Sequence, residues 1–427
     1  MLGAMLFSVL LSAIWSGSAG RWLGVRGVCA TSLVLMSLSF LFSVMCVFEA
    51  THSACLVTLP LGTWFQVGSL TLEWNFTMVD PLLCACVTGV SLLVHLFAVA
   101  YTSSDPAFIV GMCWLSLFTF FMLILACADN LVVMLVGWEG IGVASFALIG
   151  FWNTRLAATK SALKAVLVNR LGDGVLVWAV CWLIYHGGSA HPEILPLAGS
   201  SGWMGVAFFL GAIGKSAQVG FAVWLADAME GPTPVSALIH AATLVTAGVV
   251  LLARTGAACR GPLLALGCLT CFVAASMGLV QQDAKRVIAY STMSQLGYMM
   301  VSHGLGHSSL AMAHLLTHAC FKAALFLCAG GVIHVAYSGQ DQRRYGGVPV
   351  APVPATIATL SLVGWPFLSG FYTKDAILEV SWSVMHPAAD YANTVMLLVV
   401  CMTLSYGVKL CWSSFAANPA MRLPVSH

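Results

Sequence analysis

The chain has very little charge. Only 7% of its 427 residues are Asp, Glu, Lys or Arg, against the roughly 25% that is usual for a soluble domain. The 17 basic and 15 acidic side chains leave a formal net charge of +2, so the sequence offers neither a basic face for a nucleic-acid backbone nor an acidic tail. These shortages exclude an ordinary water-soluble protein and predict no nucleic-acid partner. They indicate lipid and other apolar protein as partners.

Apolar residues take the place of the missing charge. They make up 60% of the chain, and about 20 apolar residues span a bilayer as a helix. The sequence therefore predicts an all-α polytopic membrane protein. Hydropathy and Gly/Pro punctuation predict about 13 transmembrane helices, at residues 2–16, 28–48, 77–100, 106–127, 129–151, 162–186, 203–225, 233–252, 262–281, 286–302, 308–334, 350–380 and 391–413.

The segment between the second and third predicted spans differs from its surroundings. Residues 59–76 contain Gly62 and Gly68 with alternating polar and apolar side chains, a pattern typical of a β-hairpin outside the membrane. We expect residues 1–105 to hold three spans with this hairpin, 106–252 spans four to eight, and 262–413 spans nine to thirteen. Residues 414–427 form a C-terminal tail.

Fifteen cysteines are present, but nearly all lie inside apolar runs. Their positions indicate small buried hydrophobic side chains. Cys268 and Cys271 have a spacing that could bind a metal, yet no second pair accompanies them. Residues 1–16 are apolar from the start without a basic leader, which indicates a first span and not a cleaved signal or transit peptide.

Basic residues accumulate on the side of a membrane from which translocation is not performed. Counting loops by parity places Arg254 and Arg260 on one side. Three lysines, Lys215, Lys322 and Lys374, fall within spans. The other side receives twelve residues: Arg21, Arg26, Arg155, Lys160, Lys164, Arg170, Lys285, Arg286, Arg343, Arg344, Lys409 and Arg422.

Two predicted spans are interrupted. The twelfth contains Gly364, Pro366 and Gly370, and the seventh leads from Gly214 to the Gly-Pro-Thr-Pro run at 231–234. Such breaks free backbone groups at membrane depth, which is tolerated where they line a polar cavity. Two broken spans five apart, each with a lysine, predict two inverted repeats of five helices.

Several ionisable side chains lie inside the predicted spans. A charge at the bilayer centre costs about 3 kcal/mol or more, so each one needs a partner or a purpose. We expect these residues to transfer protons: Glu139, Asp173, Lys215, His240, His314, His318, Lys322, Lys374 and Asp375.

His314, His318 and Lys322 recur at steps of four, which stacks them on one helix face with the ends about 12 Å apart. Such a row suits proton transfer in short hops with water between. The alternatives are hydrogen-bonded packing residues or a zinc site, but the His-x3-His pair has no third ligand nearby in sequence.

Glu139 and Lys215 form the other notable pair. An inert buried ion pair would fix helix register, although apolar packing can replace such a pair at little cost. In the functional interpretation, attraction of about 4 kcal/mol at ~4 Å and an effective dielectric near 20 makes the proton affinity of the lysine adjustable. Moving or neutralising one carboxylate would change it.

Long motifs connect these residues to a known family. Lys215–Gln218, Trp224–Gly248, Asp283–Tyr298 and Leu316–Lys322 resemble the signature of the proton-translocating antiporter-like subunits of respiratory complex I. Leu61–Trp64, Asn169–Asp173 and Gly364–Asp375 match one branch of that family more closely. The likeness covers essentially the whole chain.

The resemblance implies a role for each residue. Glu139 corresponds to the family's glutamate in span five and Lys215 to its partner, while Asp173 and His240 belong to an input half-channel. Lys322 is similar to the central lysine, flanked by His314 and His318. Lys374 and Asp375 resemble the exit group.

The resemblance also sets expectations for cofactors and partners. It implies no flavin, iron–sulfur cluster or quinone in this chain, which performs no redox chemistry itself; other subunits hold those groups. The expected partners are lipids and other membrane-arm subunits. Family members continue past span thirteen with further helices and a lateral helix, whereas this chain stops at His427. A separate chain supplying those helices, or a processed or reduced product, would account for the difference.

The sequence thus predicts a proton-translocating subunit of an NADH:ubiquinone reductase, in the mitochondrial inner membrane. A bacterial or plastid energy-transducing membrane is the alternative location. The alternative functions are a subunit of a multisubunit cation/proton antiporter and a purely structural membrane anchor.

Overall fold

A computed structural model describes residues 1–53, 57–67, 70–194, 202–256, 259–335, 339–345, 352–384 and 387–413. This part of the chain is predominantly helical, and nine of its helices are long and apolar enough to cross a membrane. The prediction of an all-α polytopic membrane protein is confirmed. The tail at 414–427 lies outside the described residues. The divisions after residues 105 and 252 stay predictions.

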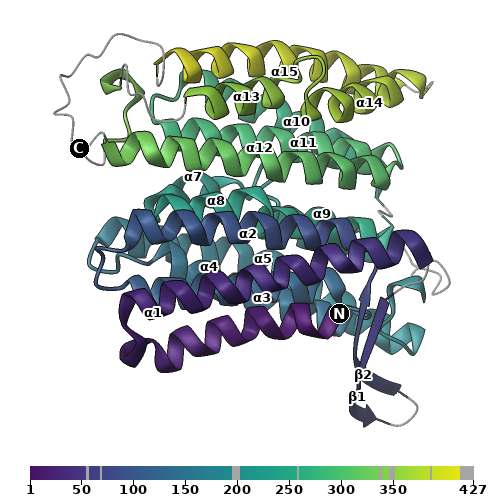
Figure 1. The fold of residues 1–427 in the computed structure, drawn as a ribbon. Helices are drawn as coiled ribbons and strands as arrows, with labels where there is room; N and C mark the ends of the chain where they lie inside the picture. The colour runs from purple at the N-terminus through teal and green to yellow at the C-terminus, as the bar shows by residue number, and fades with distance from the viewer. Residues whose placement is uncertain are drawn as a thin grey trace.

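The first helix, α1 (Leu2–Ser53), contains the first two predicted spans. Its backbone is not helical at Gly24, where φ is 66° and ψ is −179°, a conformation that glycine adopts without steric cost. Figure 1 shows α1 as two legs that run back past each other. Ser39 in the second leg donates a hydrogen bond of 3.1 Å to the Met5 carbonyl in the first.

The predicted hairpin is confirmed. Strands β1 (Val57–Val67) and β2 (Leu70–Met78) pair antiparallel, with Leu59 opposite Phe76. The hairpin projects from one end of the bundle, beside the N-terminus (Figure 1). Its base is fastened to the helices, since Asn130 donates to the Glu73 carbonyl at 2.9 Å and Thr77 donates to Asp129 at 3.0 Å.

The ends of most other predicted spans lie within about six residues of the ends of the observed helices. Boundaries predicted from sequence are usually uncertain by a few residues. These helices are α2 (Pro81–Thr102), α3 (Phe108–Cys127), α4 (Leu131–Ile149), α5 (Leu156–Gly187), α10 (Arg260–Val280), α11 (Ala284–Gly304), α12 (Ser308–Val335) and α15 (Pro387–Cys411). Short 3-10 turns lie at η1 (Pro192–Ile194), η2 (Ala228–Glu230) and η3 (Gln342–Arg344).

Three spans are interrupted. The two predicted breaks separate α6 (Gly202–Lys215) from α7 (Val223–Asp227), and α13 (Pro352–Val363) from α14 (Ser369–Ser383). At these breaks Ala217 (φ 48°) and Phe367 (φ 69°) take left-handed conformations, the only non-glycine residues to do so in the described chain. The third break, between α8 (Thr233–Ala241) and α9 (Leu244–Thr255), was not predicted.

The interrupted pair α8 and α9 lies at the centre of the molecule, whereas α13 and α14 lie beside α15 at the C-terminal side (Figure 1). Figure 1 shows the N-terminal helices, in purple and blue, on one side and the C-terminal helices, in green and yellow, on the other. Between them, the apolar window of α8 and α9 is fully buried. Helix α12 packs against α2, α8, α9, α11, α13 and α14. This arrangement surrounds α12 with elements from both halves of the chain.

Candidate functional site

Lys215 is the last residue of α6, directly before the break. Its side chain is completely buried, and its Nζ lies 3.8 Å from Oδ1 of Asp173 in α5. The ammonium also donates to the Trp138 carbonyl in α4 and lies 4.3 Å from the centroid of the Trp138 ring. An ion pair, a hydrogen bond and a cation–π contact therefore replace the water that burial removes.

Trp138 joins both members of this ion pair. Its indole nitrogen donates to Oδ1 of Asp173 at 2.6 Å, while its carbonyl and ring contact Lys215. The sequence alone does not identify Trp138 as a residue of this site. The available signal was its position beside Glu139 in the Gly-Trp-Glu-Gly run at 137–140, but the role of a backbone carbonyl has no sequence signature.

Glu139 does not pair directly with Lys215, contrary to expectation. Arg170 of α5 donates to Glu139, with the arginine side chain 65% exposed and the glutamate 34% exposed. Neighbouring residues on a helix point about 100° apart, so Trp138 faces inward while Glu139 faces the rim. The negative charge of Glu139 still acts on Lys215 over a longer range.

The placement of Arg170 in a loop is wrong, because Arg170 lies well inside α5. Lys164 also lies inside α5, where it pairs with Asp227 at 2.6 Å. Helix α5 begins at Leu156, six residues before the predicted span, since the small and polar residues that open it continue the helix beyond the apolar core. Arg170 is thus a charged neighbour of the candidate site.

Polar side chains occupy the break after Lys215. Gln218 donates to the Ser216 carbonyl at 3.0 Å and accepts a bond of 2.7 Å from Thr270 in α10. Trp224 donates to the Gly214 carbonyl at 3.2 Å. These buried bonds satisfy backbone groups that a continuous helix would have paired internally.

His240 is a buried ionisable side chain near Lys322. It is at the end of α8, wholly buried, with its ring centroid 5.5 Å from that of Phe326 in α12. Neither ring nitrogen has a hydrogen-bond partner among the described residues. The Lys322 ammonium is close enough for its charge to act on the ring.

Lys322 has no acidic partner within 4 Å in the part of the chain that the structure describes. Its buried ammonium donates to the Ser291 hydroxyl and, at 3.4 Å, to the Ile288 carbonyl, both in α11. Neutral oxygens alone therefore solvate this group, in contrast to the carboxylate beside Lys215.

His314, His318 and Lys322 share the buried face of α12, as predicted from their spacing. His314 pairs with Thr373 of α14 at 2.9 Å and with Gln295 of α11 at 3.1 Å. His318 has neither nitrogen in good hydrogen-bond geometry with a described residue, and the backbone of Ala241, next to His240, approaches it. The buried face of α12 therefore contacts α8 through His318 and α14 through His314.

Lys374 lies in α14, beyond the second break. Its buried ammonium donates to the Leu362 carbonyl at 2.5 Å and to the Val363 carbonyl at 3.5 Å. Leu362 and Val363 are the last two residues of α13. Carbonyls at a helix C-terminus favour a cation. Tyr298 presents its ring 5.5 Å from the same ammonium.

Asp375 is only partly buried and forms no ion pair within 4 Å with any described residue. The structure therefore buries seven of the nine predicted residues and leaves Glu139 and Asp375 partly exposed. The charge of Lys374 acts on both Lys322 and His314.

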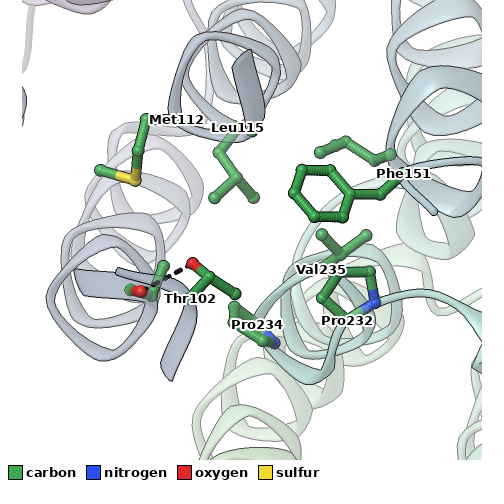
Figure 2. Close-up of a pocket in the computed structure, with 10 residues that line it drawn as sticks. Thr102, Met112, Leu115, Phe151, Pro232, Pro234 and Val235 are labelled. Atoms are coloured by element: carbon green, nitrogen blue, oxygen red, sulfur yellow. Dashed lines mark hydrogen bonds between the residues drawn. The ribbon is translucent and has the colours of Figure 1, made fainter. Parts of the chain in front are cut away.

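No group of three or more His, Cys, Asp or Glu side chains in the described ranges could hold a metal ion. A small cavity of about 20 Å³ lies near the first turn of α8. Figure 2 shows Pro232, Pro234 and Val235 facing Leu115 and Phe151 across it. None of its lining residues is one of the predicted ionisable side chains.

Interrupted helices that carry buried lysines, with carboxylates on neighbouring helices, define the antiporter-like class of membrane subunits. The family model described as NADH:quinone oxidoreductase/Mrp antiporter matches residues 128–403, and the chain belongs to this family. A second model, described as NADH-Ubiquinone oxidoreductase (complex I), chain 5 N-terminus, matches residues 64–109. The family resemblance is thereby confirmed, and it extends to the chain 5 branch.

Two curated relatives and one solved structure are similar along nearly the whole chain. NADH-ubiquinone oxidoreductase chain 5 of Chlamydomonas reinhardtii is 48% identical over 424 residues, covering 97% of this chain and 78% of the relative. Chain 5 of Marchantia polymorpha is 41% identical, covering 96% and 66%. The Mrp complex from Dietzia sp. DQ12-45-1b matches 96% of this chain and 46% of its own, with 26% identity and a TM-score of 0.80.

Proposed function

We propose that this chain translocates protons as a membrane-arm subunit of NADH:ubiquinone oxidoreductase, driven by quinone reduction in other subunits. The observation that supports it most directly is the series of buried ionisable side chains from Asp173 to Lys374. Buried charges inside membrane proteins mark ion pathways and proton relays. Membership of the complex I chain 5 branch supplies the redox context.

The first step uses the contacts of Lys215. Asp173 stabilises the charged lysine at 3.8 Å, and Glu139 adds a weaker attraction because Arg170 competes for it. Drawing either carboxylate away lowers the proton affinity of the buried amine, since burial alone disfavours its charged form. Lys215 then releases its proton toward His240.

The remaining steps follow α8, α12 and α14. His240 and His318 present ring nitrogens that are buried and available to accept or donate a proton. Lys322, solvated by neutral oxygens, takes the proton from His240 and passes it to His318, one turn away on α12. His314 is hydrogen-bonded to Thr373, the neighbour of Lys374, so the proton reaches Lys374 and leaves by way of Asp375 at the edge.

We infer thirteen membrane crossings arranged with two inverted repeats. The two legs of α1 count as two crossings, and each interrupted helix pair counts as one. The paired breaks at Ala217 and Phe367, each beside a buried lysine, support the repeat. The lysines differ in that Lys215 precedes its break and Lys374 follows its own.

The proposal includes the setting of the chain. The mitochondrial inner membrane is the location, and lipids and other membrane-arm subunits are the partners. Flavin, iron–sulfur clusters and quinone belong to those other subunits, with none in this chain. The chain spans 66% of its Marchantia relative.

Two variants test the function. Glu139→Gln removes the charge at the rim, and Lys322→Ala removes the central amine. Both variants are expected to assemble into the complex yet to lower the number of protons pumped per NADH oxidised. Lys160→Ala, at an exposed lysine of α5, is the matched control and should pump normally. Undiminished pumping by both test variants would refute the proposal.

A subunit of a multisubunit cation/proton antiporter is the second candidate, and the similarity to the Mrp complex favours it. The same acid and lysine chemistry would then run without a redox partner. Native gel electrophoresis separates the two functions, because comigration with NADH dehydrogenase activity occurs only for a complex I subunit.

A further inference from the structure

Two cysteines from distant parts of the chain meet at the contact between α2 and α12. The thiols of Cys86 in α2 and Cys320 in α12 approach each other where the two helices pack together. Cys86 Sγ also lies 3.9 Å from the carbonyl of Leu316, one turn before Cys320. Both sulfurs therefore lie at the contact between the two helices.

This contact lies on the opposite face of α12 from the proposed proton path. Cys320 is two residues from both His318 and Lys322, which turns it about 160° away from each around the helix. His318 and Lys322 are fully buried, whereas Cys320 is exposed and Cys86 partly exposed. A disulfide between Cys86 and Cys320 would restrain α12 without placing any atom in the proposed proton path.

A second thiol pair on α2 provides a contrast. Cys84 Sγ lies 3.5 Å from Cys127 Sγ in α3, and both residues are at most 1% exposed. The two pairs begin two residues apart and differ chiefly in access from outside the bundle. Since oxidation of cysteine follows exposure, the outer pair is the one that an oxidant in the bilayer can reach.

We propose that Cys86 and Cys320 are a reversible dithiol site, which lipid hydroperoxides oxidise to a disulfide. One thiol, as its thiolate, attacks the peroxide bond and becomes a sulfenic acid, while the released alkoxide takes up the thiol proton and leaves as an alcohol. The second thiol attacks the sulfenic sulfur and water leaves. Two thiols thus lose two electrons, which reduce one hydroperoxide.

The disulfide couples the oxidation state of the membrane to α12. Helix α12 contributes His314, His318 and Lys322 to the path, and a covalent bond to α2 fixes its position from the other side. Proton transfer slows because the histidines and Lys322 can no longer adjust their separation from α8 and α14. This effect rests on the proposed function, whereas formation of the disulfide does not.

The experiment uses membranes that contain the intact complex, treated with cumene hydroperoxide and then with an alkylating reagent. Peptide mass spectrometry is expected to find a Cys86–Cys320 cross-link that dithiothreitol reverses, with Cys84 and Cys127 still alkylated after denaturation. Pumping per NADH should fall about twofold or more, the scale expected for perturbing a coupled packed element, and recover with dithiothreitol.

Substitutions of single cysteines test whether the Cys86–Cys320 cross-link causes the loss of pumping. Cys320→Ser should prevent both the cross-link and the loss of pumping, while Cys181→Ser, at an exposed cysteine in α5, should change neither. Alkylated Cys86 and Cys320 in a sample where Cys181 is oxidised would overturn the site. A cross-link without any change in pumping would overturn the restraint on α12. Normal pumping by Lys322→Ala would instead overturn the proposed function, whatever the cross-link shows.

Discussion

Asp173 lies 3.8 Å from Lys215 and is the only acid within 4 Å of a fully buried lysine in the described chain. Lys322 and Lys374 bind hydroxyl and carbonyl oxygens instead. Of these three lysines, only Lys215 has an ionisable partner within 4 Å whose charge can change, while Lys322 and Lys374 have neutral dipoles. The control of proton affinity is concentrated at the α5–α6 contact.

Asp173→Asn tests this relationship. The amide keeps the size of the side chain but removes its charge, so the buried ammonium of Lys215 loses an attraction of about 4 kcal/mol. We expect Lys215 to become neutral and pumping per NADH to fall strongly. The measurement is proton uptake by vesicles during NADH oxidation.

The matched control for this substitution is Asp227→Asn, which breaks the exposed pair with Lys164. Exposed pairs contribute ~0–1 kcal/mol, so this variant should pump like the unmodified complex. Equal losses in the two variants would mean that Asp173 acts only through folding.

Trp138→Phe separates the indole from the rest of the site. Phenylalanine keeps the carbonyl and an aromatic face beside Lys215, but Asp173 loses its 2.6 Å donor. An unsatisfied buried acceptor costs about 1–3 kcal/mol. We expect a lower thermal stability of the complex and a partial loss of pumping, smaller than that of Asp173→Asn.

Trp152→Phe serves as the comparison, because it removes a similar 3.0 Å bond to Asp105 at a partly buried position. Its pumping should be normal even if its stability falls. If both tryptophan variants pumped equally well, the Trp138 indole would have no part in positioning Asp173 for proton transfer.

The sequence predicted the ionisable residues of the site and most of the helices that hold them. Charges in apolar runs are conspicuous because their burial is costly, so Asp173, Lys215 and Lys322 could be found without a structure. The spacing of His314 and His318 from Lys322 fixed their common face, since helical geometry is regular. Glycine and proline indicated both predicted breaks.

The partners of these residues could not be predicted, because they depend on how each helix is rotated about its axis. Glu139 was expected beside Lys215, but Trp138 takes the inward position and Glu139 meets Arg170. The break after α8 also has no signal in the sequence. There Thr243 takes φ −132° and ψ −93°, and its hydroxyl donates to the Leu238 carbonyl at 2.8 Å.

Arg170→Gln tests the role of the rim pair. Removing the arginine frees Glu139 to attract Lys215, which holds the lysine proton more tightly and slows its release. We expect pumping to decrease, while the free energy of unfolding changes by less than about 1 kcal/mol because the pair is exposed. Arg286→Gln breaks another exposed pair, with Asp283 at 3.5 Å, and should leave pumping unchanged. Faster pumping by Arg170→Gln would contradict this account of Glu139.

The second break depends on a close approach that only glycine allows. A Cβ on Gly370, in the first turn of α14, would lie 1.8 Å from the Ser361 carbonyl oxygen of α13. Gly370→Ala must push the two half-helices apart and lengthen the bond from Lys374 to the Leu362 carbonyl. Overpacking typically costs 1–3 kcal/mol and occasionally more, so we expect loss of about 3 kcal/mol or more and little assembled complex.

Gly174→Ala is the matched substitution, because a Cβ there meets no atom within 4 Å and the residue lies inside α5. Alanine favours a helix over glycine by about 1 kcal/mol, so this variant should assemble at least as well as the unmodified chain, and native gels with subunit immunoblots would compare the two. Normal assembly and pumping by Gly370→Ala would show that α13 and α14 are further apart than described. The Lys374 ammonium would then have no carbonyl partners at the end of α13, and the exit step of the proton path would lose its structural basis.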